Sequence, residues 1–448
     1  MTMTSPLTSA MRRAVTVAAV ALLGALSAQA QLPNASPAAF AMGGNFTAIS
    51  RGYEAIAWNP ANLGMPGRPA FSMGLFSVGG NAGLDPIDLS ALHAFSGKLV
   101  DSITAVSWID QARLAGGQRG RVDAGITPLA LTVGPVGLQV GSSAYTTLNL
   151  SPDAWEAVLF GNAGRSSGQP KTLDFTGTSI RTGAFTTGAL SFGRELPVNL
   201  TGGIIRDEHT AIGVNAKYVV GHGLAVAEDI GSALASDIQL RFPVITVRTD
   251  SIFGSTIPQQ DYNGVAGTGV GFDLAASWSG GPWKLGLLAE NVMNTFRWDT
   301  TKLAFMPGTG AFTADSLETN FDQQVYSAAP QALRDIVADQ KFPAAVTLGA
   351  AMKLTERLKL TADMKRTFGA REAISIGPRQ RFGVGAELRI LPFIPLRAGV
   401  ASVTDGWQAG AGVGVHVLGF EIGGAMSIRQ IGAARQSGAM IGLVGIGR

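Results

Sequence analysis

The chain of 448 residues contains no cysteine and little charge. Without cysteine it can form neither a disulfide framework nor a thiolate metal site, so packing and backbone hydrogen bonds must stabilise it. Asp, Glu, Lys and Arg together make up only 15% of the residues, and the mean hydropathy is +0.23. This composition is more apolar than an ordinary soluble enzyme would need.

Long apolar runs are also missing from most of the chain. After Leu26 no segment reaches the roughly eighteen consecutive apolar residues that a membrane-spanning helix needs. The sequence therefore excludes a helical membrane protein, although its composition is apolar. A chain of this kind can still cross a membrane as a closed barrel, in which every backbone polar group bonds to a neighbouring strand.

Residues suited to catalysis are sparse. The four histidines, His93, His209, His222 and His416, lie in no recognised catalytic motif. The acidic pair at 85 and 88 lacks the ligand number of a calcium loop, and the glycine-rich stretch 267–271 lacks the lysine of a phosphate-binding loop. We therefore predict no catalytic residue, no metal site and no cofactor, and we expect the protein not to be an enzyme.

An export signal accounts for part of the basic charge. Arg12 and Arg13 precede the uncharged residues 14–26, and Ala28-Gln29-Ala30 has the form of a cleavage site. These features predict a signal peptide over residues 1–30. A membrane anchor is the alternative, but thirteen residues would span only about 20 Å of a roughly 30 Å hydrocarbon core. The mature chain would retain 32 basic and 31 acidic residues, which gives no nucleic-acid signature.

Strict alternation of apolar and polar residues marks the second half of the chain. From 381 to 390 every even position is apolar and every odd one is charged or glycine. Residues 356–364 alternate in a similar way, with Leu358, Leu360, Ala362 and Met364 on one side and Arg357, Lys359, Thr361 and Asp363 on the other. Such a pattern predicts strands with one apolar face. When it recurs along an exported chain it is typical of an antiparallel β-barrel that spans the outer membrane of a diderm bacterium.

Turn signals divide the chain into fifteen candidate strands. Barrels of single bacterial chains have even strand numbers, so we predict about fourteen strands. Of the fifteen candidates, residues 70–78 have the weakest strand pattern. Short turns at 279–282, 391–392 and 418–419 suit the periplasmic rim. The candidates are residues 70–78, 121–133, 136–148, 179–194, 209–221, 236–251, 265–279, 283–294, 344–354, 357–366, 381–391, 396–403, 408–418, 420–429 and 437–446.

Several segments do not fit a barrel wall. Glycines at 410, 412 and 414 share one strand face, and such a row leaves room for another segment to approach from inside the barrel. Residues 295–342 lack sustained alternation and predict an outer loop or an insertion into the lumen, with a short helix at 330–340. Residues 98–114 and 152–160 also have helical patterns, and we expect these helices at the barrel ends.

The segment before the first strand carries the most specific motif. Residues 41–49 read AMGGNFTAI, and residues 58–64 read WNPANLG. This sequence resembles the N-terminal signature of FadL/PorV-like outer-membrane proteins. The resemblance implies a hatch over residues 31–69 that packs inside a fourteen-stranded barrel formed by residues 70–448. It places Asn59, Pro60 and Ala61 in the Asn-Pro-Ala motif of the hatch.

Two functions are compatible with such a barrel. In the first, the barrel passively transports a small hydrophobic or amphipathic solute, and the inward residues Lys359, Asp363, Arg381, Glu387 and Arg389 set the polarity of its lumen. In the second, the barrel is plugged and serves as a scaffold that docks exported or secretion-apparatus proteins. The expected partners are outer-membrane lipid together with a hydrophobic solute or an exported protein, and no nucleic acid. A soluble β-sandwich is a third, less favoured alternative.

Overall fold

A computed structural model describes most of the chain. It covers residues 32, 36–96, 98, 100–161, 172–202, 204–234, 238–248, 264–312, 317–369, 373–374, 377–404, 406–431 and 434–447. The signal peptide expected at residues 1–30 lies outside these ranges. Within them, no helix combines the length and the apolar character that crossing a membrane requires.

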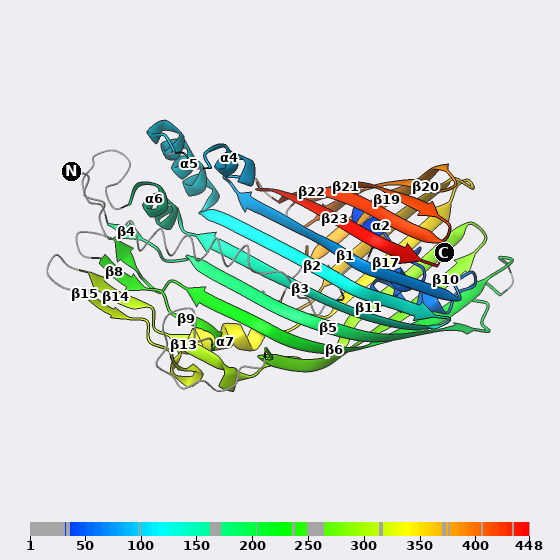
Figure 1. Ribbon diagram of the computed structural model, residues 1–448, viewed down its shortest axis with the longest axis horizontal. Coiled ribbons are helices and arrows are strands. Elements are labelled where there is room, and N and C mark those ends of the chain that lie inside the picture. The colour runs from blue at the N-terminus through cyan, green and yellow to red at the C-terminus, as the bar shows by residue number, and fades with distance from the viewer. Residues whose placement is uncertain are drawn as a thin grey trace.

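Fourteen long antiparallel strands form a closed barrel (Figure 1). Each of these strands pairs with the next one along the chain. The last strand also pairs with the first, in a register that sets Met73 opposite Ile446, and this pairing closes the ring. Closure leaves no unpaired edge, so the wall is compatible with lipid. The strands are β1 (Phe71–Asp85), β2 (Gln118–Val133), β3 (Val136–Leu150), β5 (Ser179–Leu196), β6 (His209–Glu228), β10 (Gly267–Gly280), β11 (Trp283–Asn294), β17 (Ala345–Lys353), β18 (Leu358–Thr367), β19 (Gln380–Leu391), β20 (Ile394–Val403), β21 (Gly406–Val417), β22 (Phe420–Ile431) and β23 (Ala434–Ile446).

The alternation of the sequence becomes the two faces of the wall. On β19, Phe382 is 60% exposed and Val384 is 48% exposed. The alternate residues of the same strand, Gly383, Gly385 and Glu387, are buried. Large apolar side chains are similarly exposed on most other barrel strands. An apolar outer face around a closed barrel is the arrangement that spans an outer membrane. The predicted fold class is therefore confirmed.

One of the fifteen candidate strands is not part of the wall. Residues 236–251 contribute two short strands, β8 (Ile238–Arg241) and β9 (Val244–Val247), which pair with different neighbours. They are separated by Phe242 and Pro243, and a proline has no N–H to continue a ladder. The candidate at 70–78, in contrast, belongs to β1, which extends to Asp85 and closes the barrel.

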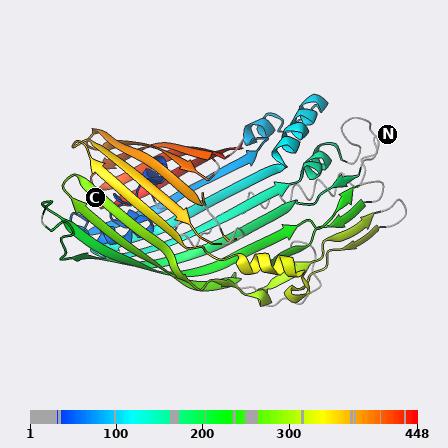
Figure 2. The same ribbon diagram turned by 180° about the vertical axis from the view of Figure 1, so that it is seen from behind.

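The two ends of the barrel differ. At the end that carries the C-terminus, most connections are tight turns, such as those between β2 and β3 or between β21 and β22. The opposite end carries the long connections and extends well beyond the barrel (Figures 1 and 2). By the rule that periplasmic turns are short, the C-terminal end is the periplasmic end.

Three helices lie at the outer end, namely α4 (Leu89–Ala94), α5 (Ser102–Ala115) and α6 (Pro152–Phe160). Of these, α5 and α6 match the helical patterns predicted at 98–114 and 152–160, while α4 was not predicted. Asp101 caps α5 by accepting a hydrogen bond from the Thr104 amide, and hydrogen bonds from Thr104 lower the pKa of Asp101. The helix ends at Gly116, whose φ of 76° suits glycine. Trp108 and Trp155 bury their side chains between α5 and α6, so the helices pack on each other.

The remaining outer elements form two groups. The segment 295–342 contributes η2 (Thr300–Lys302), η3 (Tyr326–Ala328) and α7 (Gln331–Asp339), and β12 (Arg297–Trp298), β13 (Leu303–Met306) and β16 (Gln324–Val325) continue the barrel sheet beyond the wall. A separate five-stranded sheet has the order β15-β14-β8-β7-β4. It adds β4 (Leu173–Asp174), β7 (Ala233–Leu234), β14 (Thr309–Phe312) and β15 (Leu317–Asn320) to β8.

The predicted insertion reaches the inner face of the barrel. Phe296 and Trp298 pack against Phe185 of β5, with ring centroids 5.6 and 5.3 Å apart, and Phe342 joins the same cluster. Leu333 and Val337 bury one side of α7 against it, and α7 lies beside β6 (Figure 2). This aromatic cluster therefore covers part of the lumen near the outer end. The expectation of a lumen insertion with a short helix is met by residues 296–342.

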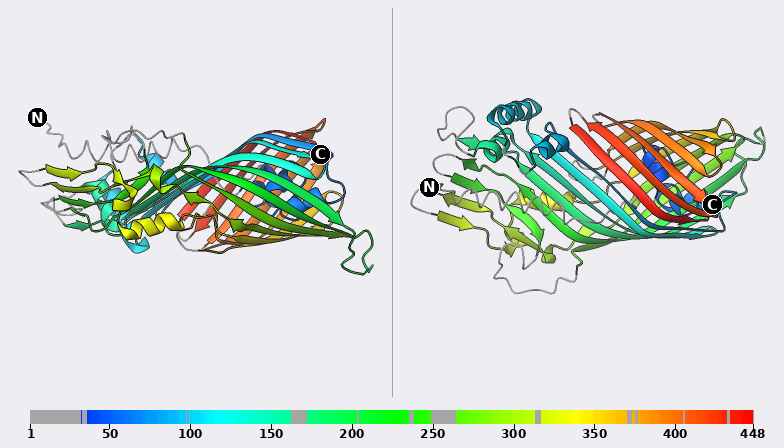
Figure 3. Two further views of the ribbon diagram at one scale, coloured as in Figure 1. Left: turned by 90° about the horizontal axis from the view of Figure 1, so that it is seen from below. Right: turned by 45° about the horizontal axis from the view of Figure 1, so that its top comes forward.

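The N-terminal segment forms a compact plug inside the barrel. It contains α2 (Pro37–Ala41), α3 (Tyr53–Trp58) and the 3-10 helix η1 (Pro60–Leu63), and nearly all of their residues are buried. Figure 3 shows the segment enclosed by the strands near the C-terminal end. The Ser36 hydroxyl caps α2 and donates to the Glu54 carboxylate at 2.5 Å, which ties α2 to α3. We refer to residues 36–69 as the hatch.

Candidate functional site

Glycines on the inner wall let the hatch touch the strand backbone. A Cβ atom built on Gly399 would lie 2.1 Å from the Met42 carbonyl oxygen, and one on Gly410 would lie 2.7 Å from the carbonyl oxygens of Phe40 and Ala41. On the other side of the barrel, a Cβ atom built on Gly213 would lie 2.2 Å from the Ala61 amide nitrogen. The glycine row predicted to face an occupied lumen therefore does so.

Two of the predicted lumen residues form hydrogen bonds with the hatch loop that follows α2. The Asp363 carboxylate accepts hydrogen bonds from the Phe46 amide at 3.1 Å, the Thr47 amide at 3.0 Å and the Thr47 hydroxyl at 2.6 Å. Arg381 donates to the Gly44 carbonyl at 2.7 Å. These bonds join β18 and β19 to a segment more than 300 residues away in sequence, and their charged partners make them stronger than neutral hydrogen bonds.

The motif residues lie where the hatch turns toward the opposite wall. Asn59 has extended geometry, with φ −170°, and its side-chain oxygen accepts a hydrogen bond from the Ala61 amide while its amide group donates to the Ala276 carbonyl of β10. Pro60 opens η1, where its missing N–H costs no helical hydrogen bond. Ala61 is fully buried beside Gly213. The motif thus shapes a turn that contacts β6 and β10.

The other three predicted lumen residues form an ion-pair cluster at the periplasmic rim. Glu387 accepts from Lys359 at 3.0 Å, from Arg389 at 3.3 Å and from Arg397 at 2.9 Å. The cluster continues through Glu421 to His416, whose ring nitrogen lies 2.8 Å from the carboxylate. The three predicted residues lie on the face of β18 and β19 opposite the exposed apolar side chains, and they mainly pair with one another.

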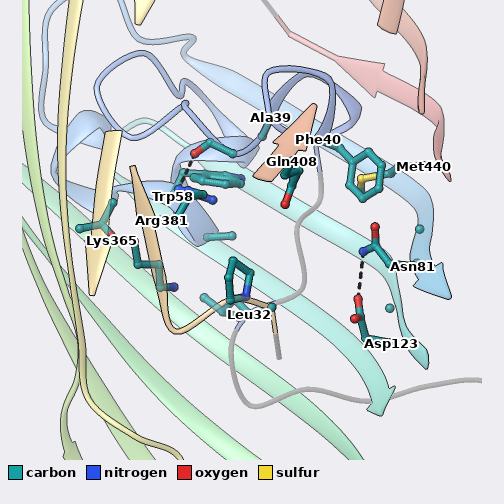
Figure 4. Close-up of a pocket in the computed structure, with 18 of the residues that line it drawn as sticks. Leu32, Ala39, Phe40, Trp58, Asn81, Asp123, Lys365, Arg381, Gln408 and Met440 are labelled. Atoms are coloured by element: carbon teal, nitrogen blue, oxygen red, sulfur yellow. Dashed lines mark hydrogen bonds between the residues drawn. The ribbon is translucent and has the colours of Figure 1, made fainter. Parts of the chain in front are cut away.

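A cavity of about 190 Å³ lies on the outer side of the hatch (Figure 4). Its apolar lining includes Phe40 and Trp58 of the hatch, together with Leu32 and Met440. In Figure 4, Trp58 and Arg381 lie on one side of the cavity, and Asn81 and Asp123 lie on the other. The wall is polar and carries the side chains of Asn81, Asp123, Glu290, Thr347, Lys365, Arg381, Gln408 and Arg429.

The polar wall is partly neutralised by its own contacts. Lys365 pairs with Glu290, and Asn81 donates to Asp123 at 3.0 Å. Arg429 donates to Gln408 at 3.0 Å, and the Arg381 guanidinium lies 5.9 Å from the centre of the Trp58 ring, a cation–π distance. The arrangement can hold a small molecule with both an apolar and a polar part. In the described part of the chain, no cluster of three or more His, Asp or Glu side chains is placed to hold a metal ion.

Sequence reasoning found Asp363 and Arg381 but missed most of the cavity. Gln408 and Arg429 lie on the inner faces of two correctly predicted strands, so extending the alternation rule to β21 and β22 would have found them. Trp58 is part of the hatch motif, yet its exposure to a cavity has no sequence signal. The paired groups Glu290 and Lys365 are 75 positions apart, and only the pairing of β11, β17 and β18 brings them together.

These features define a fourteen-stranded membrane β-barrel that is closed near its periplasmic end by an internal hatch. No family model matches the chain, and no curated protein matches it. Among solved structures, the chain is similar to the toluene transporter TbuX of Ralstonia pickettii, with 14% identity and a TM-score of 0.48 over 92% of this chain and 98% of that one. It is also similar to the monoaromatic hydrocarbon channel CymD, with 12% identity and a TM-score of 0.48 over 92% of this chain and 97% of that one. A FadL homologue of Pseudomonas aeruginosa is also similar, with 13% sequence identity and a TM-score of 0.44, over 93% of this chain and 98% of that one.

Proposed function

We propose that the protein is a passive outer-membrane channel for a small hydrophobic or amphipathic solute. The observation that carries this proposal is the cavity itself, which lies inside a membrane barrel, directly against the hatch, and is lined by both apolar and polar side chains. Binding sites for small molecules usually have this composition, with mostly apolar walls and a few placed polar groups. The proposal assigns no catalytic residue to the chain.

The hatch supplies the gate in this proposal. It fills the periplasmic end of the lumen, so a solute in the cavity can proceed only if part of the hatch moves. Its contacts with the wall are hydrogen bonds and van der Waals contacts, such as those to Asp363 and Gly399, and these can break and reform. A concentration gradient is then sufficient to drive net flow.

A disulfide clamp between the hatch and the wall tests this proposal. A Cβ atom on Gly423 of β22 would lie 3.4 Å from the Cβ of Pro37, close to the roughly 3.8 Å separation in disulfides. The double variant Pro37→Cys/Gly423→Cys can form no other disulfide, because the natural chain has no cysteine. Initial uptake of two radiolabelled single-ring probes, neutral toluene and anionic benzoate, is measured in cells of a diderm host that produce the natural chain, the double variant or neither.

We expect the natural chain to raise uptake, the oxidised clamp to reduce it at least fivefold, and a reducing agent to restore it. The single variants Pro37→Cys and Gly423→Cys serve as controls and should respond to neither oxidant nor reductant. Uptake no higher than in cells without the protein would contradict the channel proposal. If native mass spectrometry then shows a stoichiometric protein partner on the purified barrel, the scaffold hypothesis would replace it.

A further inference from the structure

The cavity wall carries more positive charge than its own carboxylates neutralise. Of its charged residues, Lys365 is paired with Glu290, and Asp123 lies 3.5 Å from Arg121. Arg381 and Arg429 have no carboxylate within ion-pair distance among the residues that the structure describes. Asp363, on the strand next to Arg381, is already bonded to three donors of the hatch.

Both arginines also have hydrogen-bond donors to spare. A guanidinium group has five N–H donors. Among the described residues, Arg429 uses its Nε on Gln408, while its Nη1 has no partner, and Arg381 uses Nη2 on Gly44, while its Nε has none. Arg429 is only 5% exposed, so water satisfies little of its hydrogen-bonding capacity. A buried cation that forms no direct ion pair is unfavourable, and an anionic ligand bound to it would relieve part of that cost.

The size of the cavity limits the ligand. An engineered protein cavity of about 150 Å³ is known to accept benzene. A volume of about 190 Å³ therefore fits one ring with a small substituent, whereas a long acyl chain would extend beyond it. The faces of Phe40 and Trp58, with the Met440 thioether, offer apolar contacts for a ring.

We infer that the solute of this channel is a compact acid, a single ring that carries a carboxylate. The ring packs against Phe40, Trp58 and Met440, and the carboxylate binds on the side of Arg429 and Arg381. This inference rests on the proposed channel function and makes it specific. A neutral hydrocarbon would fill the same space but would leave both guanidinium groups unpaired, and sites built for a polar group discriminate strongly against ligands that lack it.

Calorimetric titration of the mature protein in amphipol tests the inference, with benzoate and the neutral analogue benzyl alcohol as probes at pH 7.5. We expect benzoate to bind at least tenfold more tightly than benzyl alcohol. Hydrogen bonds to charged groups contribute about 1.5–3 kcal/mol, so Arg429→Gln should weaken benzoate binding by roughly 10- to 100-fold. Benzyl alcohol should change less than about threefold.

Additional variants keep the test decisive. Arg429→Lys keeps the charge and should lose less benzoate affinity than Arg429→Gln, while Arg381→Gln should resemble Arg429→Gln and replaces it if that variant does not fold. Arg357→Gln, at an exposed position in the turn before β18, is the matched control and should bind benzoate normally. Heat-modifiable migration on gels reports whether each barrel is folded.

The inference is overturned if natural protein binds benzoate no better than benzyl alcohol, or if folded arginine variants bind benzoate unchanged. Either result, together with protein-dependent and clamp-sensitive toluene uptake, would leave the channel proposal intact and make the solute neutral. If benzoate binds as expected but uptake is absent, the cavity is an acid-binding site in a barrel that does not conduct. Loss of both binding and uptake would remove the two proposals together.

Discussion

At the scale of single residues, one carboxylate has the largest role in holding the hatch. Asp363 is 1% exposed and accepts three hydrogen bonds from Phe46 and Thr47 through the same oxygen. Its neighbour Arg381 holds the preceding turn of the hatch at Gly44. Two adjacent strands thus fix the loop that links α2 to α3 through charged groups, whereas α3 and η1 are held by neutral hydrogen bonds, such as those from Asn215 to Ile56 and from Ser277 to Asn62, and by close packing.

We predict that Asp363→Ala loosens this loop while the barrel stays folded. The substitution leaves two buried amides and one hydroxyl without their acceptor, at a cost of about 3 kcal/mol. Hydrogen–deuterium exchange at Phe46 and Thr47 should therefore be roughly 100-fold faster. Asp363→Asn keeps a neutral acceptor and should give an intermediate rate.

Glu356→Gln provides the control for this prediction, because Glu356 forms an exposed pair with Lys353 at the periplasmic rim. Its effect on exchange in the hatch loop should be negligible, since exposed pairs contribute little. Equal exchange rates in the natural protein and in Asp363→Ala would show that packing alone holds the loop.

At the scale of elements, the hatch and the wall fit because strand glycines face hatch backbone. The carbonyl of Met42 at the end of α2 lies over Gly399 of β20, and the backbone of η1 lies over Gly193 and Gly213. Glycine is normally unfavourable within a strand, but here any side chain would occupy the space of the hatch. The wall and the hatch therefore depend on each other's sequence at these positions.

Gly399→Ala should displace the hatch because the new Cβ would overlap the Met42 carbonyl. Overpacking of this kind costs about 1–3 kcal/mol, so we expect amide exchange in residues 42–47 to rise by about tenfold or more. The matched substitution Gly424→Ala lies on β22, where no atom comes within 4 Å of the new Cβ. It should leave exchange unchanged. Similar rates in both variants would contradict the close contact between α2 and β20.

At the scale of the whole molecule, the lumen is narrowed at two levels. The hatch fills the periplasmic end, and the aromatic cluster of Phe185, Phe296, Trp298 and Phe342 covers one side nearer the outer end. The cavity borders the hatch and lies within the same barrel. In the proposed channel, a solute that enters from outside would pass the cluster before it reaches the cavity, and would pass the hatch after it.

The double variant Phe296→Ala/Trp298→Ala should widen the outer part of the lumen. Both side chains lie against Gly221 of β6, so truncating them leaves space that the wall cannot fill. We expect a larger ion conductance in planar bilayers and a lower thermal stability, since each such truncation costs about 3–5 kcal/mol. Phe393→Ala, at an exposed position on the periplasmic rim, is the control. Unchanged conductance in a folded variant would show that the cluster does not restrict the pore.

The sequence by itself determined the wall of this barrel. Side chains alternate between the two faces of a strand, so a membrane outside and a polar interior leave their pattern in each strand separately. That is why runs such as 381–391 could be assigned without a structure. The pattern failed at 236–251, where Pro243 divides an apparently continuous strand.

Only the tertiary structure decided what the inward residues do. The alternation predicts an inward position for Asp363 and Arg381, but it says nothing of their hatch partners, which are more than 300 residues away in sequence. Lys359, Glu387 and Arg389 have the same sequence pattern as these two residues, yet they pair with one another at the rim. Alternation specifies the face of a strand and not the height or the partner of a side chain. Those depend on how fourteen strands align around the hatch, which is a property of the closed barrel.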